Sequence, residues 1–249
     1  WPIPKSERDE FSRSLTKITH SRNALIPLIK DIITHILQRK DVPTDLSIIN
    51  SIMDNFFALV GREYIHAALL PFFNPSQASH NSPLMVTSLH TDFERDLCFD
   101  LKSETDDTAA YQRQFLKNFK IIVESVLAPD NLAKLPAEVR EIASYLYTCA
   151  QEYVPDKADQ LVAGFVIRPI INALQRPDLY DLLEKPYVPL PTTKENIALL
   201  CRVLQHLILQ QTFHKNLKFM AFCNLTLEEK FKVLKECIKQ ICQPSQAAS

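Results

Sequence analysis

Only two glycines, Gly61 and Gly164, occur in this chain of 249 residues. Antiparallel sheets need residues with positive φ in their tight hairpin turns, and glycine is the usual choice there. A chain so poor in glycine favours helices joined by longer loops, and many of its 16 prolines fall in such connections. We predict an all-α fold, and the length is that of a single large domain spanning residues 1–249.

The spacing of apolar residues supports an all-α fold. Apolar residues recur three and four positions apart, as on one face of a helix, over residues 25–36, 48–69, 115–126, 139–149 and 197–207. The second of these helices is predicted to continue to Pro71. Residues 74–92 are polar without this spacing and residues 184–193 are rich in proline, so both are predicted to be connections.

A last helix is predicted over residues 226–243, followed by a tail at residues 244–249. Thr226 and Glu229 have the spacing of a capping box. In this motif the threonine side chain accepts a hydrogen bond from a free backbone N–H group, and the glutamate reaches back to the cap residue. The predicted helix therefore begins at Thr226.

Charge and cysteine content exclude several classes of protein. The formal net charge is −1, so no basic field attracts nucleic acid. The 6 cysteines include no C-x-x-C pair, and we interpret them as reduced core cysteines of a cytoplasmic protein. No apolar run reaches the roughly 20 residues of a membrane span, so direct membrane insertion is not expected.

Motifs of enzyme chemistry are also missing from the sequence. There is no phosphate-binding G-x-x-x-x-G-K-[ST] loop, and two glycines cannot build a dinucleotide site. No H-E-x-x-H motif or close cluster of histidine, cysteine and carboxylate predicts zinc. The carboxylates of residues 92–107 lack calcium-loop spacing, and we interpret them as a solvated acidic segment. The chain is predicted to have no metal, no cofactor of its own and no enzymatic active site.

One stretch, GFVIRPIINALQRPDLY at residues 164–180, combines an arginine with an otherwise apolar run. A buried guanidinium is costly unless it is paired, and the proline that follows Arg168 usually ends or kinks a helix. Two interpretations fit the stretch. Arg168 is buried with its donors bonded to backbone carbonyls, or it is a surface arginine beside a proline bend.

Two segments of the chain carry a resemblance to a known family. VIRPIINALQRP, residues 166–177, resembles the F-L-R-F-x-x-P-A-x-x-x-P signature of Ras GTPase-activating (RasGAP) domains, with Arg168 on the signature arginine. RVLQHLILQQTF, residues 202–213, resembles the family's K-x-L-Q-x-[LI]-A-N-x-x-x-F segment, with Arg202 and Gln205 on marked positions.

Weaker segments agree in order and spacing. GREYIHAAL at residues 61–69 resembles the family's G-x-x-Y-L-x-x-x-L helix. YQRQFL at residues 111–116 resembles its N-x-x-x-L-L segment, and LPAEVR at residues 135–140 its [FL]-P-x-x-[LV]-[RK] segment. The resemblance covers about residues 20–225 and implies an elongated, single-domain helical fold.

The resemblance implies a regulator of a partner GTPase. RasGAP domains bind a Ras-like small GTPase that holds GTP and Mg²⁺, insert an arginine finger into its active site and so stimulate GTP hydrolysis. GTP and Mg²⁺ belong to the partner. The signature arginine holds the finger loop in place, and this role is carried to Arg168. A cytoplasmic location is expected, with recruitment to membranes by other parts of a parent protein.

The chain departs from the family pattern at the finger itself. The finger arginine lies seventeen positions before the glycine of the G-x-x-Y-L segment, and here that position is Thr44. Threonine supplies no cation. A shifted loop can present Arg39 or Lys40, although a lysine lacks the planar fork that grips phosphate oxygens. The alternative for both is a basic last turn of the preceding helix, which the helix dipole favours.

Two further positions differ: Asn172 replaces a signature proline, and Leu209 replaces a signature asparagine. Three hypotheses stay open: a GTPase activator, a GTPase-binding or scaffolding module without a usable finger, and a helical domain whose groove serves another protein. In the first two, we expect the docking groove to be formed by Pro43, Thr44, Asp45, Ser47, Arg168, Asn172, Lys194, Arg202 and Gln205.

Overall fold

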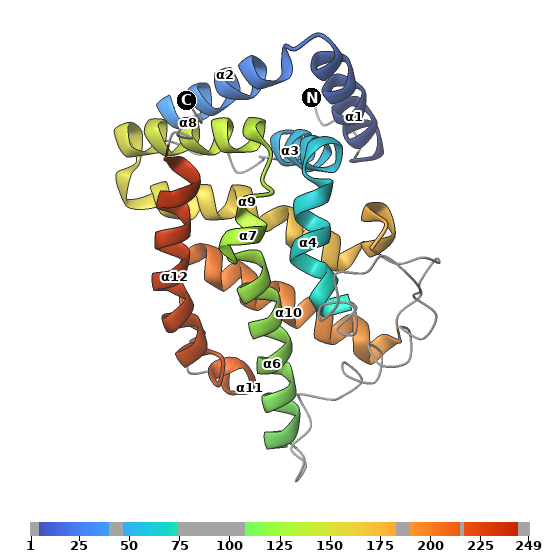
Figure 1. Ribbon diagram of the computed structural model, residues 1–249, viewed down its shortest axis with the longest axis vertical. Coiled ribbons are helices and arrows are strands. Elements are labelled where there is room, and N and C mark those ends of the chain that lie inside the picture. Colours follow the sequence, from blue (N-terminus) through green and yellow to red (C-terminus); the bar gives the residue numbers. More distant parts are fainter. Residues whose placement is uncertain (1–4, 40–46, 74–107, 183–189, 215–216, 244–249) are drawn as a thin grey trace.

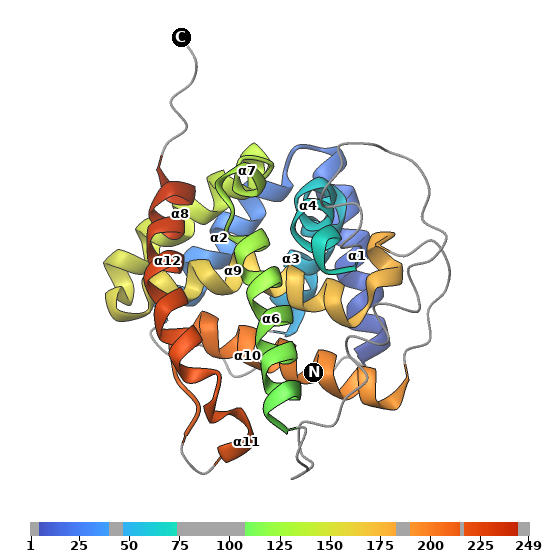
Figure 2. The same ribbon diagram turned by 60° about the horizontal axis from the view of Figure 1, so that its bottom comes forward.

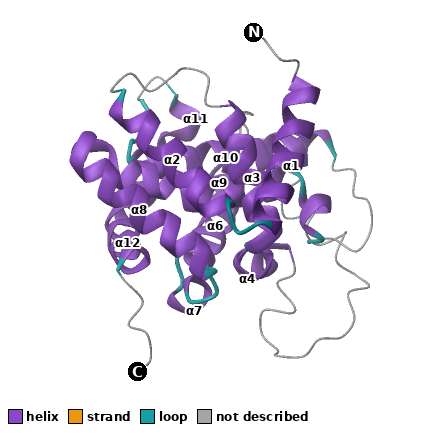
Figure 3. Ribbon diagram, turned by 90° about the horizontal axis from the view of Figure 1, so that it is seen from above, coloured by secondary structure: helices purple, strands orange, loops and turns teal. Residues whose placement is uncertain are grey.

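The computed structural model describes residues 5–39, 47–73, 108–182, 190–214 and 217–243. These residues form helices joined by loops, with no strand among them (Figures 1 and 3). The prediction of an all-α fold is confirmed. The elements, in chain order, are α1 (Lys5–Ser21), α2 (Leu25–Gln38), α3 (Ser47–Val60), α4 (Arg62–Phe73), α6 (Thr108–Val126), α7 (Pro129–Leu132), α8 (Ala137–Tyr153), η1 (Pro155–Lys157), α9 (Ala158–Gln175), η2 (Pro177–Tyr180), α10 (Pro191–Leu209), α11 (Lys218–Ala221) and α12 (Asn224–Cys242).

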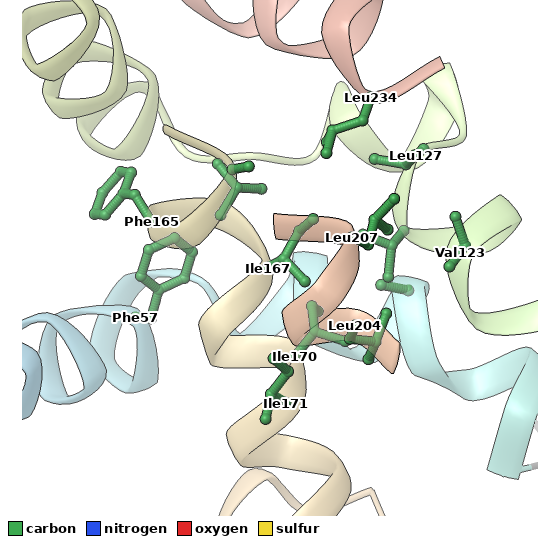
Figure 4. Close-up of a cluster of buried hydrophobic side chains, with 14 of the residues drawn as sticks. Phe57, Val123, Leu127, Phe165, Ile167, Ile170, Ile171, Leu204, Leu207 and Leu234 are labelled. Atoms are coloured by element: carbon green, nitrogen blue, oxygen red, sulfur yellow. The ribbon is translucent and has the colours of Figure 1, made fainter. Parts of the chain in front are cut away.

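Helix α9 lies at the centre of the fold and contacts α3, α4, α8, α10 and α12. Its residues Ile167 and Ile170 point toward Leu204 and Leu207 of α10 (Figure 4), and all four side chains are buried. In Figure 2, α6 crosses in front of α9 and α10. The core therefore packs around the helix that carries Arg168 and Pro169.

Helix α9 does not break at Pro169, contrary to the expectation from the sequence. It continues without interruption from Ala158 to Gln175. Proline removes one backbone donor from the helix ladder, but Pro169 and the isoleucines on either side are buried in the core. Packing of this face over the whole length of α9 outweighs the local cost of the proline.

The helix predicted from residue 48 to Pro71 is in fact two helices. Helices α3 and α4 meet at Gly61 with their axes bent by 86°. A Cβ atom at Gly61 would lie 2.7 Å from Phe57 Cδ1, closer than Cβ atoms approach in real structures, and 3.0 Å from Phe57 O, which is tighter than most. The corner requires glycine for this close approach, which hydrophobic periodicity cannot reveal.

No single helix of the described ranges has the length and apolarity of a membrane span. The bent pair α3–α4 passes that test by length and composition alone. Most of its large apolar side chains, including Phe56, Phe57, Tyr64 and Ile65, are buried in the core.

Helix α1 has no counterpart in the sequence-based prediction. Its fully buried positions are Ser12 and Thr16, and its large residues Phe11 and Ile18 are exposed. Helix α1 packs against α3, and Thr16 Oγ1 donates a hydrogen bond to the Ser12 carbonyl at 2.7 Å. Its large apolar residues Phe11, Leu15 and Ile18 have helical spacing, but of these three only Leu15 packs against the core.

Two predicted boundaries differ from the structure. Helix α10 begins at Pro191, inside the stretch predicted to be a connection, because proline suits the first turn of a helix. Helix α12 begins at Asn224, so the prediction of Thr226 as the N-cap is wrong. The Asn224 side chain accepts from the Phe213 N–H group at 2.8 Å and donates to the Phe213 carbonyl at 3.1 Å, which fixes the helix start.

The cysteines within the described ranges form no disulfide. Cys149, Cys201, Cys223 and Cys237 are buried and Cys242 is half-buried, all as free thiols. The burial of Cys149, Cys201, Cys223 and Cys237 agrees with the prediction that they are core residues.

Candidate functional site

A groove of about 540 Å³ opens between α2, α3, α9 and α10. Its walls are mostly apolar side chains, half of the lining residues being isoleucine or leucine, with a few polar groups among them. The lining residues are Ile29, Ile32, Ile33, Ile36, Leu37, Ile52, Met53, Asp54, Leu146, Gln160, Leu161, Gly164, Phe165, Arg168, Pro169, Ile171, Asn172, Gln175, Gln205 and Ile208. This combination of an apolar floor with few polar groups is typical of a recognition site.

The polar groups of the groove come largely from one face of α9. Gln160, Arg168, Asn172 and Gln175 are spaced by multiples of three or four residues, and so share that face. The antiparallel helix α10 runs alongside, since Gln160 Nε2 donates a 3.0 Å hydrogen bond to the Leu209 carbonyl near its end.

Arg168 lies at the surface of this groove rather than in the core. Its side chain is 45% exposed, and its Nε atom lies 3.6 Å from Oδ1 of Asp54 on α3, whose side chain is 31% exposed. The interpretation of Arg168 as buried is therefore wrong. Three of its neighbours in the stretch, Ile167, Ile170 and Ala173, point into the core, whereas helical geometry turns Arg168 outward.

Asp54 and Arg168 are the charged residues of the groove lining, and their charges cancel. The described groove is thus neutral and largely apolar.

Most of the chain matches a known protein family. The family model "RasGAP: GTPase-activator protein for Ras-like GTPase" matches residues 25–208, from the start of α2 to the end of the groove wall on α10. The chain belongs to the RasGAP family. Helices α1, α11 and α12 lie outside the matched region.

Two relatives of this RasGAP domain are much longer proteins. Neurofibromin-A of Dictyostelium discoideum is 26% identical over 232 residues, covering 89% of this chain and 25% of the relative. The human Ras GTPase-activating protein nGAP is 23% identical over 196 residues, covering 77% of this chain and 16% of the relative. The chain thus spans a quarter or less of the length of these relatives.

The RasGAP groove brings together three of the residues expected there, namely Arg168, Asn172 and Gln205. Arg202 and Lys194 are exposed on α10 but do not line the groove. Arg202 lies three residues before Gln205, so both project from the same side of α10. A surface that extends the groove along α10 would include Arg202.

The finger segment falls largely outside the described residues. Pro43, Thr44 and Asp45 lie there, with Lys40, and only the backbone of Ser47 is described, as the first residue of α3. Arg39 is exposed at the C-cap of α2. This position agrees with the alternative in which Arg39 forms a basic helix end.

The helices before and after the finger segment both line the groove. Leu37, in the last turn of α2, and Ile52, in the second turn of α3, each line it. Residues 40–46 therefore connect two helices that both contribute to the groove.

A second polar cluster lies where α4 meets η2. His66 Nε2 donates to the Tyr180 carbonyl at 2.6 Å, and Arg62 pairs with Asp181 at 2.6 Å. Burial, with a smaller contribution from the Asp54 charge, raises the pKa of Tyr180 to about 12. The Tyr180 hydroxyl is therefore neutral at physiological pH.

The sequence-based reasoning missed Asp54, Gln160 and Gln175 as groove residues. For Asp54 a signal was present, since it is the one charged residue in the helix SIINSIMDNFFALV. An acid in such an apolar helix points to a polar partner on another element.

Proposed function

We propose that this RasGAP domain binds the GTP-loaded form of a Ras-like small GTPase through the groove and stimulates its GTP hydrolysis. The family match over residues 25–208 is the observation that carries the proposal. The human relative is itself named a Ras GTPase-activating protein. The domain acts as a regulator, and GTP and Mg²⁺ are supplied with the partner. Its action is expected in the cytoplasm, with membrane recruitment left to other parts of the parent protein.

The chemical task of such a domain is to place a cation beside the transferring phosphoryl group. An arginine supplied in trans raises kcat by about 10³–10⁵ in the reaction of Ras with its activators, which corresponds to roughly 4–7 kcal/mol of transition-state stabilisation. Thr44 cannot supply this charge. Arg39 is the described cation nearest to that position in the sequence, and it follows directly on the helix whose Leu37 lines the groove.

The proposed docking surface has an apolar centre and a polar edge. The apolar groove receives apolar side chains of the GTPase, while Asn172 and Gln205 offer hydrogen bonds and Arg168 a charge. Arg202 and Lys194 stand on the exposed side of α10, where they steer an acidic partner. Pro43, Asp45 and Ser47 complete the surface in this proposal.

A second candidate function is binding without activation. Thr44 at the expected finger position favours it, because a domain that retains the groove but lacks a finger sequesters or scaffolds its GTPase. The two candidates share the docking step and differ in the chemical step.

Docking is tested by titrating fluorescent-nucleotide-loaded Ras and Rap with the domain, in the GTP and GDP states. Both candidates predict tighter binding to the GTP state. Equal affinity for the two states, or no binding to either GTPase, contradicts both, and the groove then serves another protein. Hydrolysis measured in the same samples separates activation from binding alone.

A further inference from the structure

The ion pair between Asp54 and Arg168 joins two helices that are already held together by other contacts. One helical turn from the pair, the rings of Phe57 on α3 and Phe165 on α9 pack edge to face, with their centroids 5.2 Å apart. Figure 4 shows these two rings facing each other across the helix boundary. Both side chains are buried, so the apolar contact supplies the adhesion between α3 and α9 at this point.

The Asp54–Arg168 ion pair therefore has a different role from the packing of Phe57 against Phe165. Both of its side chains are partly exposed, at 45% and 31%, and ion pairs in such positions add little to stability. An arginine side chain on a groove surface has many rotamers, however, and the charge of a carboxylate on the neighbouring helix favours those that bring Nε toward it. The Asp54 charge thus favours positions of the Arg168 guanidinium on the α3 side of the groove.

The position of Asp54 in the chain links this pair to the finger segment. Asp54 lies on α3, which begins at Ser47, three residues after Thr44 in the sequence. Asp54 is seven positions after Ser47 in this helix, a rise of about 10 Å. The helix that follows the finger segment thus also carries the carboxylate that orients the signature arginine.

Because Asp54 approaches the Nε atom, the two terminal amino groups of the Arg168 guanidinium can bind a second partner. A guanidinium presents five N–H donors in one plane, and the Nε atom is the one nearest to Asp54. The terminal amino groups of Arg168 can then donate hydrogen bonds to acceptors in the docked complex, while the Asp54 carboxylate orients the plane of the guanidinium.

We propose that Asp54 is a positioning residue for GTPase docking, which holds the Arg168 guanidinium in the orientation that the docked complex uses. The inference rests on the proposed function. In this proposal Asp54 affects docking by orienting Arg168, and it need not contact the GTPase itself.

The test uses four groove variants and one matched control. Asp54→Asn removes the charge at nearly constant size, and Asp54→Glu keeps it. Arg168→Gln and the double variant Asp54→Asn/Arg168→Gln complete a double-mutant cycle. The control is Glu124→Gln, which removes the same charge from the 2.8 Å pair between the exposed Glu124 of α6 and the half-buried Lys230 of α12, elements that do not line the groove.

The first measurement needs no GTPase. The ¹⁵N resonance of Arg168 Nε and the exchange rate of its proton are recorded in the folded domain. Asp54→Asn should shift the resonance and speed the exchange, Asp54→Glu should largely retain both, and Glu124→Gln should leave them unchanged. If Asp54→Asn leaves both at their wild-type values, Asp54 does not position Arg168 and the inference is overturned.

The second measurement is the affinity for Ras loaded with a non-hydrolysable GTP analogue. Asp54→Asn should weaken it about two- to fivefold, the effect of an exposed ion pair, and should add less than about 1.5-fold on the Arg168→Gln background. An equal loss on both backgrounds would mean that Asp54 acts independently of Arg168, which refutes the inference. A wild-type domain that binds no GTP-state GTPase would refute the proposed function instead, and the Arg168 resonance would still decide whether Asp54 holds that side chain.

Discussion

The two glycines of the chain are expected to respond in opposite directions to the same substitution. At Gly61 a new Cβ atom meets a ring carbon of Phe57 at 2.7 Å and its carbonyl oxygen at 3.0 Å. The oxygen belongs to the backbone, and the ring is fully buried against Phe165, so neither can retreat freely. Overpacking of this kind costs about 1–3 kcal/mol. Gly61→Ala should therefore destabilise the domain.

Gly164→Ala is the matched control. Its Cβ atom would meet Ile208 Cγ2 at 3.5 Å, an ordinary van der Waals contact, in the interior of α9. Replacing a helical glycine with alanine at such a site stabilises by about 0.5–1 kcal/mol.

Thermal and urea unfolding measure both variants. For a domain of this size 1 kcal/mol corresponds to about 2–4 °C in Tm. We therefore expect Gly61→Ala to lower Tm by roughly 2–12 °C and Gly164→Ala to raise it by roughly 1–4 °C. Shifts of the same sign in both variants would refute the reasoning that the α3–α4 corner depends on close approach at Gly61.

Three further outcomes follow from the site and the core. Arg168→Ala should change the free energy of unfolding by no more than about 1 kcal/mol, because its ion pair is partly exposed, yet weaken GTPase binding in a titration; a loss of several kcal/mol would mean that the side chain is buried. Arg202→Ala should weaken GTPase binding with unchanged Tm, and unchanged affinity would remove Arg202 from the docking surface. Burial raises the pKa of Cys201 and of Cys223 to about 12 from 9.0, so the folded state retains protons that the unfolded state loses, and stability should fall as pH rises from about 9 toward 12; urea unfolding at pH 8 and pH 10 measures this, and equal stability at both would contradict it.

The helices that the sequence predicts correctly are those with an apolar stripe. Residues 25–36, 115–126 and 139–149 all lie in helices of the structure, because their apolar side chains face one common core. Helix α1 was not predicted, and its fully buried positions are Ser12 and Thr16, which give no apolar signal. The spacing of apolar residues predicts a buried helix face only where the buried side chains are themselves apolar.

The site was predictable in part for a related reason. Arg168, Asn172 and Gln205 were identified through the family signatures, and they do meet in one groove. The exposure of Arg168 and its pairing with Asp54 depend on how α9 turns against α3. That orientation is set by contacts between residues more than a hundred positions apart, such as Phe57 and Phe165, which no local spacing encodes.

The central claim is tested most directly by single-turnover hydrolysis of GTP on Ras and Rap, with and without a large excess of the domain. The account predicts acceleration of more than about a hundredfold, a threshold that lies below the roughly 10³–10⁵ that a finger supplied in trans provides, and loss of that acceleration in Arg39→Ala if Arg39 acts as the displaced finger. GTP-dependent binding with no acceleration would contradict activation and establish the domain as a binding module, with Thr44 as the reason.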